Sequence, residues 1–267
     1  MNWISQDIRL EEAKVHLYQS ENVKEPIIFL HGAMDNGLCW SPIAEELSAQ
    51  YHVIMPDARG HGLTDALKED WTYDAMADDV KAVIEKLELK KLSLIGHSMG
   101  GNIGTIVAQK YPNMVKKLIL EDPGFAIGEF SWIKKAFYKF LMKIFLNLFL
   151  RGDAEKIYQR GKKQNPKWSE KELEPWAESK VQFKNQNPSK SLKSLTLPYN
   201  WKEIVKNIEC PTLLITAEKG IMEDEFAKKV LELNKNFKWI KVEGAGHNIR
   251  RENTEDYLSA IRDFLQD

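Results

Sequence analysis

The chain has 267 residues, 43% of them hydrophobic, and its 38 basic and 39 acidic side chains give a formal net charge of −1. This composition can form a large buried core, and the charge balance argues against a nucleic-acid partner. Cys39 and Cys210 are too few for a disulfide framework, so we expect two free thiols. The first residues lack the basic region and apolar stretch of a secretory signal, so we expect a cytoplasmic protein.

Short apolar runs alternate with segments of helical periodicity along most of the chain. This alternation predicts an α/β fold in which a mostly parallel sheet is flanked by helices on both faces. The apolar spacing predicts helices over residues 73–87 and at the C-terminus, where Asn253 is the expected helix start. The segments that are nearly all apolar, as buried parallel strands should be, are residues 27–30, 53–55, 92–95, 118–120, 213–215 and 239–242.

The segment after the apolar run 92–95 reads Gly96-His97-Ser98-Met99-Gly100-Gly101. This spacing is typical of a nucleophilic serine on a tight strand-to-helix turn, because larger residues two positions before and after the serine would clash with the backbone. The segment lacks the lysine of a phosphate-binding loop and the glycine spacing of a dinucleotide-binding loop. No metal-ligand spacing of histidines and cysteines is present either. We therefore expect a serine nucleophile and neither a cofactor nor a metal.

A serine nucleophile needs a base to remove its proton and an acid to orient that base. His247 lies in Gly244-Ala245-Gly246-His247-Asn248, which we predict as a flexible loop between the last strand and the last helix. In open α/β sheets, sites form at the C-terminal edge of the strands, where such a loop can place an imidazole. We therefore predict His247 as the base. The other histidines lie in predicted strands or in other turns: His16, His31, His52, His61 and His97.

Residues 125–201 carry no strand signal and are rich in Trp, Phe, Lys and Asn. We predict an inserted helical cap over 125–201 and a core formed by 1–124 and 202–267. Within the cap, residues 132–150 are strongly apolar but carry Lys135, Lys139 and Lys143 every four residues, which predicts an amphipathic helix with a basic stripe. Its length and its lysines exclude a transmembrane span. We favour a lid over a substrate pocket, because the insertion falls between strands; the alternative is a helix on a membrane surface.

Four motifs in sequence order carry a resemblance to a known family. They are His31-Gly32, Asp57-x-Arg59-Gly60-His61-Gly62, Gly96-x-Ser98-x-Gly100-Gly101 and Gly246-His247. Together they resemble the α/β-hydrolase-fold serine hydrolases of the esterase and lipase type, over essentially the whole chain. The resemblance implies an α/β-hydrolase fold with an inserted helical cap, and a structural role for His31 and the 57–62 turn.

The resemblance also bears on the chemistry. It implies an oxyanion hole formed by the backbone N–H groups of Ala33 and Met99, which would stabilise the developing negative charge. Haloalkane dehalogenases and epoxide hydrolases of this fold need a carboxylate at the nucleophile position, so Ser98 argues against both.

The acid is where the chain departs from the family pattern, which usually places an aspartate in a short loop after the strand predicted here at 212–216. That loop contains Glu218, which we expect to lie two residues past the strand, and we predict it as the acid. The alternative is Asp122, after the strand 118–120, because some members of the fold take their acid from the end of the preceding strand.

From these residues we expect hydrolysis of carboxylic esters with small to medium apolar acyl groups, through an acyl-serine intermediate on Ser98. We expect Trp132, Phe137 and Phe140 of the cap to line the substrate pocket, and a monomer or homodimer. The same triad serves lactonases, thioesterases and carbon–carbon bond hydrolases, so these remain alternatives. Outside the enzymes, the alternative is a non-catalytic receptor for a small molecule.

Overall fold

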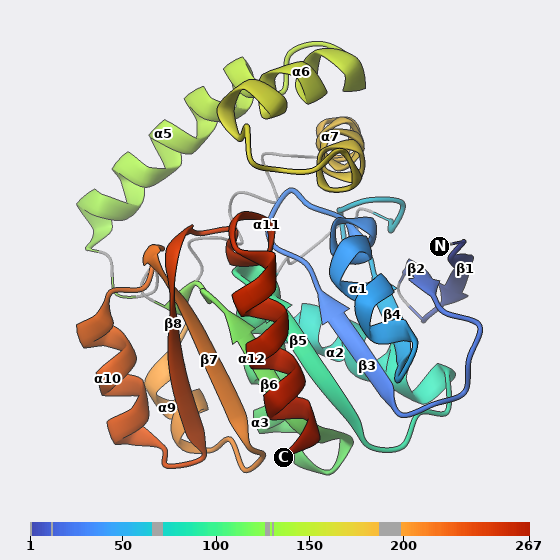
Figure 1. Ribbon diagram of the computed structural model, residues 1–267, viewed down its shortest axis with the longest axis vertical. Helices are drawn as coiled ribbons and strands as arrows, with labels where there is room; N and C mark the ends of the chain where they lie inside the picture. The colour runs from blue at the N-terminus through green and yellow to red at the C-terminus, as the bar shows by residue number, and fades with distance from the viewer. Residues whose placement is uncertain (1, 12, 66–71, 126–128, 130, 187–198) are drawn as a thin grey trace.

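The computed structural model describes residues 2–11, 13–65, 72–125, 129, 131–186 and 199–267. Eight strands form one sheet in the order β1-β2-β4-β3-β5-β6-β7-β8 (Figure 1). Pairing is antiparallel for β1 with β2 and for β2 with β4, and parallel for every other pair. All six predicted strands are present, so the mostly parallel sheet is confirmed. The strands are β1 Ile4–Arg9, β2 Lys14–Gln19, β3 Pro26–Leu30, β4 His52–Pro56, β5 Leu92–His97, β6 Val115–Glu121, β7 Thr212–Lys219 and β8 Phe237–Gly246.

Helices cover both faces of the sheet. On one face lie α1 (Ser41–Ser48) and α12 (Thr254–Gln266); on the other lie α2 (Tyr73–Lys86), α3 (Met99–Lys110), α9 (Trp201–Lys206) and α10 (Asp224–Leu233). A short helix, α11 (Ile249–Glu252), precedes α12. The side chain of Asn253 accepts a hydrogen bond from the backbone N–H of Asp256, so the predicted start of the last helix is confirmed.

The core forms because the central strands are apolar on both sides. Successive residues of a strand point to opposite faces, so Leu94 of β5 packs under α2 and α3 while its neighbour Ile95 packs under α1 and α12. In register with Leu94 lie Ile28 of β3 and Leu118 of β6, both fully buried. This packing fixes the strands that carry the candidate site at their C-terminal ends.

The strands are longer than the sequence predicts, and the extensions of two of them affect the site. β7 runs through Lys219, so Glu218 lies within the strand and not two residues past it. β8 runs through Gly246, so the segment 244–246 is strand and not a flexible loop. The two strands pair along this extension with a register shift between Ala217 and Lys219. Pairing between neighbouring strands, which local apolar patterning does not report, is the physical reason for both extensions.

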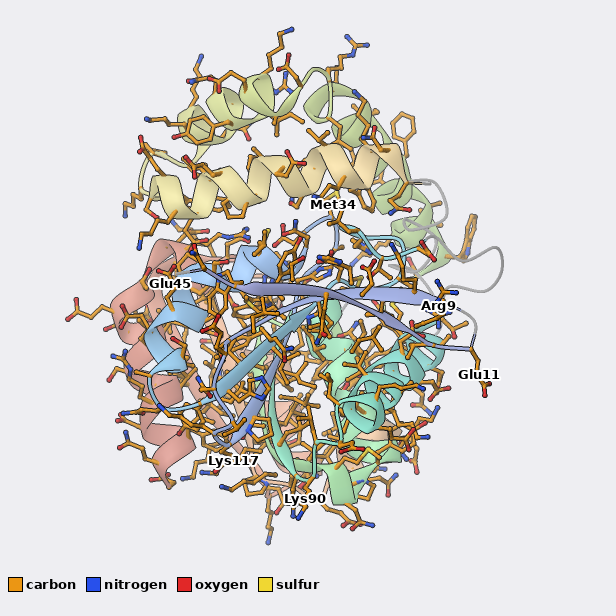
Figure 2. All side chains as sticks on the ribbon, turned by 90° about the vertical axis from the view of Figure 1, so that its right-hand side faces the viewer. Arg9, Glu11, Met34, Glu45, Lys90 and Lys117 are labelled. Atoms are coloured by element: carbon orange, nitrogen blue, oxygen red, sulfur yellow. The ribbon has the colours of Figure 1, made fainter. Side chains whose placement is uncertain are left out.

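In the described part of the cap, three helices lie above the C-terminal ends of the strands: α5 (Trp132–Phe149), α6 (Ala154–Gln164) and α7 (Glu170–Asn185). Helices α6 and α7 share a small apolar core that includes Ile157, Leu173 and Trp176. Figure 2 shows α7 lying across the top of the core above Met34. Residues 129, 131–186 and 199–201 contain no strand. The predicted limits of the cap adjoin segments outside the described residues, 126–128, 130 and 187–198, so the division into core and cap stays a prediction.

Two further features of the described chain bear on the sequence analysis. Cys39 and Cys210 are both buried and free, as expected. In the part of the chain that the structure describes, no helix has the length and apolar character needed to cross a membrane.

Candidate active site

Ser98 lies on the turn between β5 and α3, and its backbone is strained. Its φ is +51°, which is rare for a residue with a side chain. The glycines around it are needed for space: a Cβ atom on Gly96 would lie 2.4 Å from the carbonyl oxygen of Gly100, and one on Gly100 would lie 2.1 Å from that of Leu30. The backbone N–H of Ser98 donates to the carbonyl of Glu121 at 3.0 Å, which joins the turn to the end of β6. The predicted elbow is therefore present, with a half-buried serine at its tip.

The structure places Asp122, not Glu218, against His247. Nδ1 of His247 lies 2.7 Å from Oδ2 of Asp122, whose side chain is fully buried, whereas the imidazole is 32% exposed. Asp122 follows β6 directly and has a φ of +40°. Its carboxylate also accepts hydrogen bonds from the backbone N–H groups of Ile221 at 2.8 Å and Met222 at 3.1 Å. A carboxylate held in this way can orient the imidazole and stabilise its charged form.

The prediction that Glu218 orients His247 is wrong in this structure. Glu218 lies on the exposed end of β7, and its carboxylate accepts a hydrogen bond from the backbone N–H of Gly244 at 3.0 Å. The loop that follows β7 instead supplies the two N–H donors that hold Asp122. The sequence signal for Asp122 is an aspartate directly after a buried strand, at the edge where His247 was expected.

His97 links the elbow to the His247 segment. Nε2 of His97 lies 2.9 Å from the backbone carbonyl oxygen of His247, and the two imidazole rings are 4.7 Å apart. Burial, together with the nearby charges of Arg250 and His247, holds the pKa of His97 well below its usual value. A neutral His97 can donate its Nε2 proton to that carbonyl and fix the backbone that carries the candidate base.

The predicted oxyanion-hole residues lie on the two segments that flank Ser98. Met99 is the first residue of α3, so its N–H has no acceptor within the helix. The turn before Ala33 is close to the elbow, because a Cβ atom on Gly32 would lie 3.5 Å from Cβ of Ser98. These positions agree with the expected arrangement, and the oxyanion role of the two N–H groups stays a prediction.

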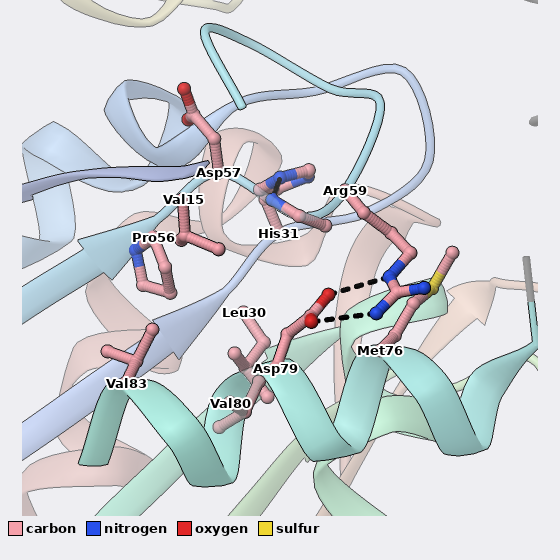
Figure 3. A pocket seen from close by; sticks show the side chains of 11 residues that line it. Val15, Leu30, His31, Pro56, Asp57, Arg59, Met76, Asp79, Val80 and Val83 are labelled. Atoms are coloured by element: carbon pink, nitrogen blue, oxygen red, sulfur yellow. Dashed lines mark hydrogen bonds and ion pairs between the residues drawn. The ribbon is translucent and has the colours of Figure 1, made fainter. Parts of the chain in front are cut away.

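The motif residues expected to be structural hold the neighbouring loops. Asp57 accepts hydrogen bonds from the N–H groups of Gly37 at 2.7 Å and Leu63 at 2.8 Å, and Nε2 of His31 accepts from Ala58 N–H at 2.9 Å. Arg59 pairs with Asp79 of α2 through two hydrogen bonds of 2.6 and 2.7 Å (Figure 3). These residues also line a small, largely apolar cavity beside α2. They stabilise the turns and lie apart from the Asp122–His247 pair.

A network of buried charged side chains, which the sequence analysis missed, joins the cap to the segment after His247. Arg251 of α11 donates from Nη2 to Oδ2 of Asp35 at 2.9 Å and from Nε to Oε2 of Glu172 in α7 at 3.1 Å. Lys180 of α7 donates to Oδ1 of Asp35 at 2.6 Å. Burial acts to raise the pKa of Asp35, but the charges of Arg251, Lys180 and Arg250 outweigh it and leave that pKa well below the usual value.

The same network reaches the residue before the candidate acid. Arg250, which is fully buried, donates from Nη1 to Oε2 of Glu121 at 3.0 Å and from its backbone N–H to Oε1 at 3.1 Å. Burial raises the pKa of Glu121, and Arg250 opposes this shift. No local pattern distinguishes these charges from solvated ones, which is why sequence reasoning missed them. The pairs fix α11, and with it the position of His247, relative to β6.

The cap residues expected to line a pocket are exposed in this structure. Trp132, Phe137 and Phe140 of α5 are 79%, 61% and 60% exposed, and none lines a described cavity. The side chains of Lys135, Lys139 and Lys143, on which the predicted basic stripe depends, lie outside the described part of the structure. Substrate contact by the three aromatic residues therefore stays a prediction. Among the described residues there is no cluster of side chains that could hold a metal ion.

This sheet order, with a strained serine after β5 and a histidine paired to an aspartate at the same edge, defines an α/β hydrolase. A family model of the alpha/beta hydrolase fold matches residues 25–253, and the chain belongs to that family. It is similar to epoxide hydrolase 1 of Caenorhabditis elegans, with 27% identity over 98% of this chain and 70% of that protein. It is also similar to a putative esterase/lipase of Haemophilus influenzae, with 29% identity over 93% of this chain and 87% of that protein.

Solved structures share the fold. The crystal structure of E-2-(acetamidomethylene)succinate hydrolase matches over 100% of both chains with a TM-score of 0.82 and 19% identity. At this identity the likeness shows the fold alone.

Proposed function

We propose that the chain is a serine hydrolase that cleaves carboxylic esters with small to medium apolar acyl groups. The observation that carries the proposal is the strained Ser98 at the tip of the elbow, at the same sheet edge as the hydrogen-bonded pair of His247 and Asp122. A serine nucleophile, a base and a buried acid are the three groups that acyl transfer to water requires.

In the proposed mechanism, Oγ of Ser98 attacks the ester carbonyl carbon while Nε2 of His247 takes the hydroxyl proton. Asp122 holds Nδ1 of His247 protonated and stabilises the imidazolium. The oxyanion of the tetrahedral intermediate accepts hydrogen bonds from the N–H groups of Ala33 and Met99. The intermediate collapses to acyl-Ser98 as the alcohol leaves with the proton from His247. Water then attacks the acyl carbon as His247 takes its proton. The bond to Oγ breaks, the acid leaves, and His247 returns the proton to Oγ of Ser98.

The relatives leave other bond types open as alternatives. One relative is named an epoxide hydrolase. Epoxide hydrolases of this fold need a carboxylate nucleophile, and position 98 is a serine, so we do not favour epoxide hydrolysis. Lactones, thioesters and certain carbon–carbon bonds are cleaved by the same triad, so substrate tests must include them. A receptor that keeps the fold without catalysis is the remaining alternative.

A fluorophosphonate probe tests the nucleophile. We expect folded wild-type protein to become labelled at Ser98, and the Ser98→Ala variant to stay unlabelled. Heat-denatured wild-type protein is the second control, because labelling requires the assembled site. Folded wild-type protein that stays unlabelled would overturn the proposed hydrolase.

A substrate series then tests the bond and the acyl group. We expect p-nitrophenyl esters from acetate to octanoate to be hydrolysed faster than lactones and thioesters of matched acyl length. A preference of more than about tenfold for lactone or thioester would replace the ester assignment, since tenfold corresponds to about 1.4 kcal/mol in the barrier.

A further inference from the structure

Helix α5 exposes large apolar side chains along one of its faces. Ile133, Phe137, Phe140, Ile144 and Leu148 are between 41% and 61% exposed, and Trp132 at the start of the helix is 79% exposed. Spacings of three and four residues place 133, 137, 140, 144 and 148 on one side of an α-helix. Figure 1 shows α5 extending away from α7 along the outer side of the cap. This is a contiguous apolar surface, and such surfaces mark sites of interaction.

Helix α7 of the cap is held on the core by specific polar contacts. Helix α7 is tied to the core by buried ion pairs, Lys180 with Asp35 and Glu172 with Arg251. Gln186, directly after α7, also donates from Nε2 to the carbonyl of Thr64 at 3.0 Å. The described apolar side chains of α5 belong to no core cluster of the described chain. Among the described residues, the cap therefore has one helix fixed on the core, α7, and one helix, α5, whose apolar face packs in no core cluster.

The charge of α5 indicates what binds this face. Residues 132–149 contain four lysines and no aspartate or glutamate, in a chain whose net charge is −1. A helix with exposed Ile, Phe and Leu side chains on one side and a uniformly positive charge has the pattern of a segment that lies in the plane of an anionic lipid surface.

We propose that α5 binds the surface of an anionic lipid bilayer, with its apolar face inserted among the acyl chains near the headgroups. The helix is not one that could span the bilayer. A second copy of the chain fits less well, because pairing two α5 helices would bring eight like charges together, four from each copy. An anionic lipid surface can bury the apolar face among its acyl chains and attract the lysines to its headgroups.

Sedimentation with vesicles tests the apolar face. The probe is sonicated vesicles of phosphatidylcholine with 30% phosphatidylglycerol at low salt, compared with phosphatidylcholine alone. We expect wild-type protein to partition onto the anionic vesicles. The double variant Phe137→Ser with Phe140→Ser should bind at least about tenfold more weakly, because it lacks the two aromatic side chains that would be buried in the lipid. The matched control is Val23→Ser with Leu63→Ser, two exposed apolar residues outside the cap, which should bind like wild type.

A second pair of variants tests the charge. Lys135→Gln, Lys139→Gln and Lys143→Gln together should weaken partitioning on the order of 100-fold, because each lysine near an anionic surface contributes on the order of 1 kcal/mol. The control removes the same charge elsewhere, with Lys86→Gln, Lys90→Gln and Lys91→Gln, all exposed residues. Figure 2 shows Lys90 at the end of the molecule opposite the cap, so this control should retain binding.

Several results would overturn the proposal. It fails if wild-type protein does not sediment with anionic vesicles, or if the α5 variants and their controls bind equally well. Gel filtration run in parallel would reveal a dimer that dissociates in the Phe137→Ser, Phe140→Ser variant; with no vesicle binding, that result would assign the face to a second copy. Sedimentation requires no turnover, so its failure leaves the proposed ester hydrolysis untouched.

Discussion

Oδ2 of Asp122 lies 2.7 Å from Nδ1 of His247, on a loop that follows β6 rather than β7. The proposed acid therefore follows the strand next to the one that precedes Ser98. The loop after β7 has a different task here: its Ile221 and Met222 N–H groups hold the carboxylate of Asp122 in place. Because Asp122 contacts His247 and Glu218 does not, the roles of the two carboxylates can be tested separately.

Replacing Asp122 should remove most of the activity. Asp122→Asn keeps the shape of the side chain but cannot stabilise the imidazolium or select the same tautomer, so we expect kcat for p-nitrophenyl butyrate to fall by about 10³ to 10⁴. The matched variant Glu218→Gln removes an exposed carboxylate that accepts a hydrogen bond from Gly244 N–H. We expect its kcat to stay within about threefold of wild type. The opposite ranking of the two variants would return the acid role to Glu218.

Gly220 lies against the carboxylate of Asp122, the proposed acid. A Cβ atom at this residue would lie 2.6 Å from Oδ2 of Asp122, so Gly220→Ala must displace either the carboxylate or the loop. We expect kcat to fall by roughly ten- to a hundredfold, because a shift of about 1 Å in a supporting group misaligns the reacting atoms.

The same variant should leave the fold largely intact, since Gly220 is not at a positive φ. Its melting temperature, followed by circular dichroism, serves as the control for Gly220→Ala. An unchanged kcat in a folded variant would show that the contact between Gly220 and Asp122 does not position the acid.

The buried ion pairs between α7 and α11 should make a large difference to stability. Arg251→Met leaves Glu172 buried without its guanidinium partner, and leaves Asp35 with Lys180 and Arg250 but without Arg251. We therefore expect the free energy of unfolding to drop by about 3–5 kcal/mol. The control is Lys162→Met, which breaks an exposed pair with Glu170 and should cost less than about 1 kcal/mol. Urea unfolding followed by fluorescence measures both. Similar losses in the two variants would mean that the buried network does not stabilise the docked cap.

Acid should destabilise the fold through its buried histidines. Burial, with the charge of His31 nearby, lowers the pKa of His61 to about 3, and burial also lowers the pKa of His31 and of His97. The unfolded chain takes up protons near pH 6.5 while folded His61 does not, so stability is complete above that pH and is lost as the pH falls toward 3. For His61 alone we expect a loss of about 1.4 kcal/mol between pH 7.5 and 5.5.

A variant isolates this histidine contribution. Burial raises the pKa of Glu121 and of Glu172, and these groups act in the opposite direction as the pH falls. His61→Asn should therefore narrow the difference between the unfolding free energies at pH 7.5 and 5.5, whatever its effect on absolute stability. If the difference is the same in wild type and variant, His61 is not the titrating group.

Local sequence was sufficient for the features that depend on neighbouring residues. The run Leu92–Ile95 predicts a strand because a buried parallel strand is apolar on both faces. Gly96 and Gly100 predict the elbow because the steric demand of that turn acts within five residues. His247 was predicted as the base from its place between the last strand and the last helix, and the motif order indicated the family.

Only the tertiary structure decided between Glu218 and Asp122. The choice depends on a register shift between β7 and β8, which keeps Glu218 in the strand, and on a loop from β7 that folds over the end of β6. The pairing of Asp35 with Arg251 and the exposure of Phe137 likewise depend on contacts between segments far apart in the chain. The sequence by itself therefore determined the sheet, and it predicted Ser98 as the nucleophile and His247 as the base. The carboxylate that pairs with His247 was decided only by the packing of β6, β7 and β8 at the C-terminal edge of the sheet. Hydrogen bonds between segments far apart in the chain leave no local sequence pattern.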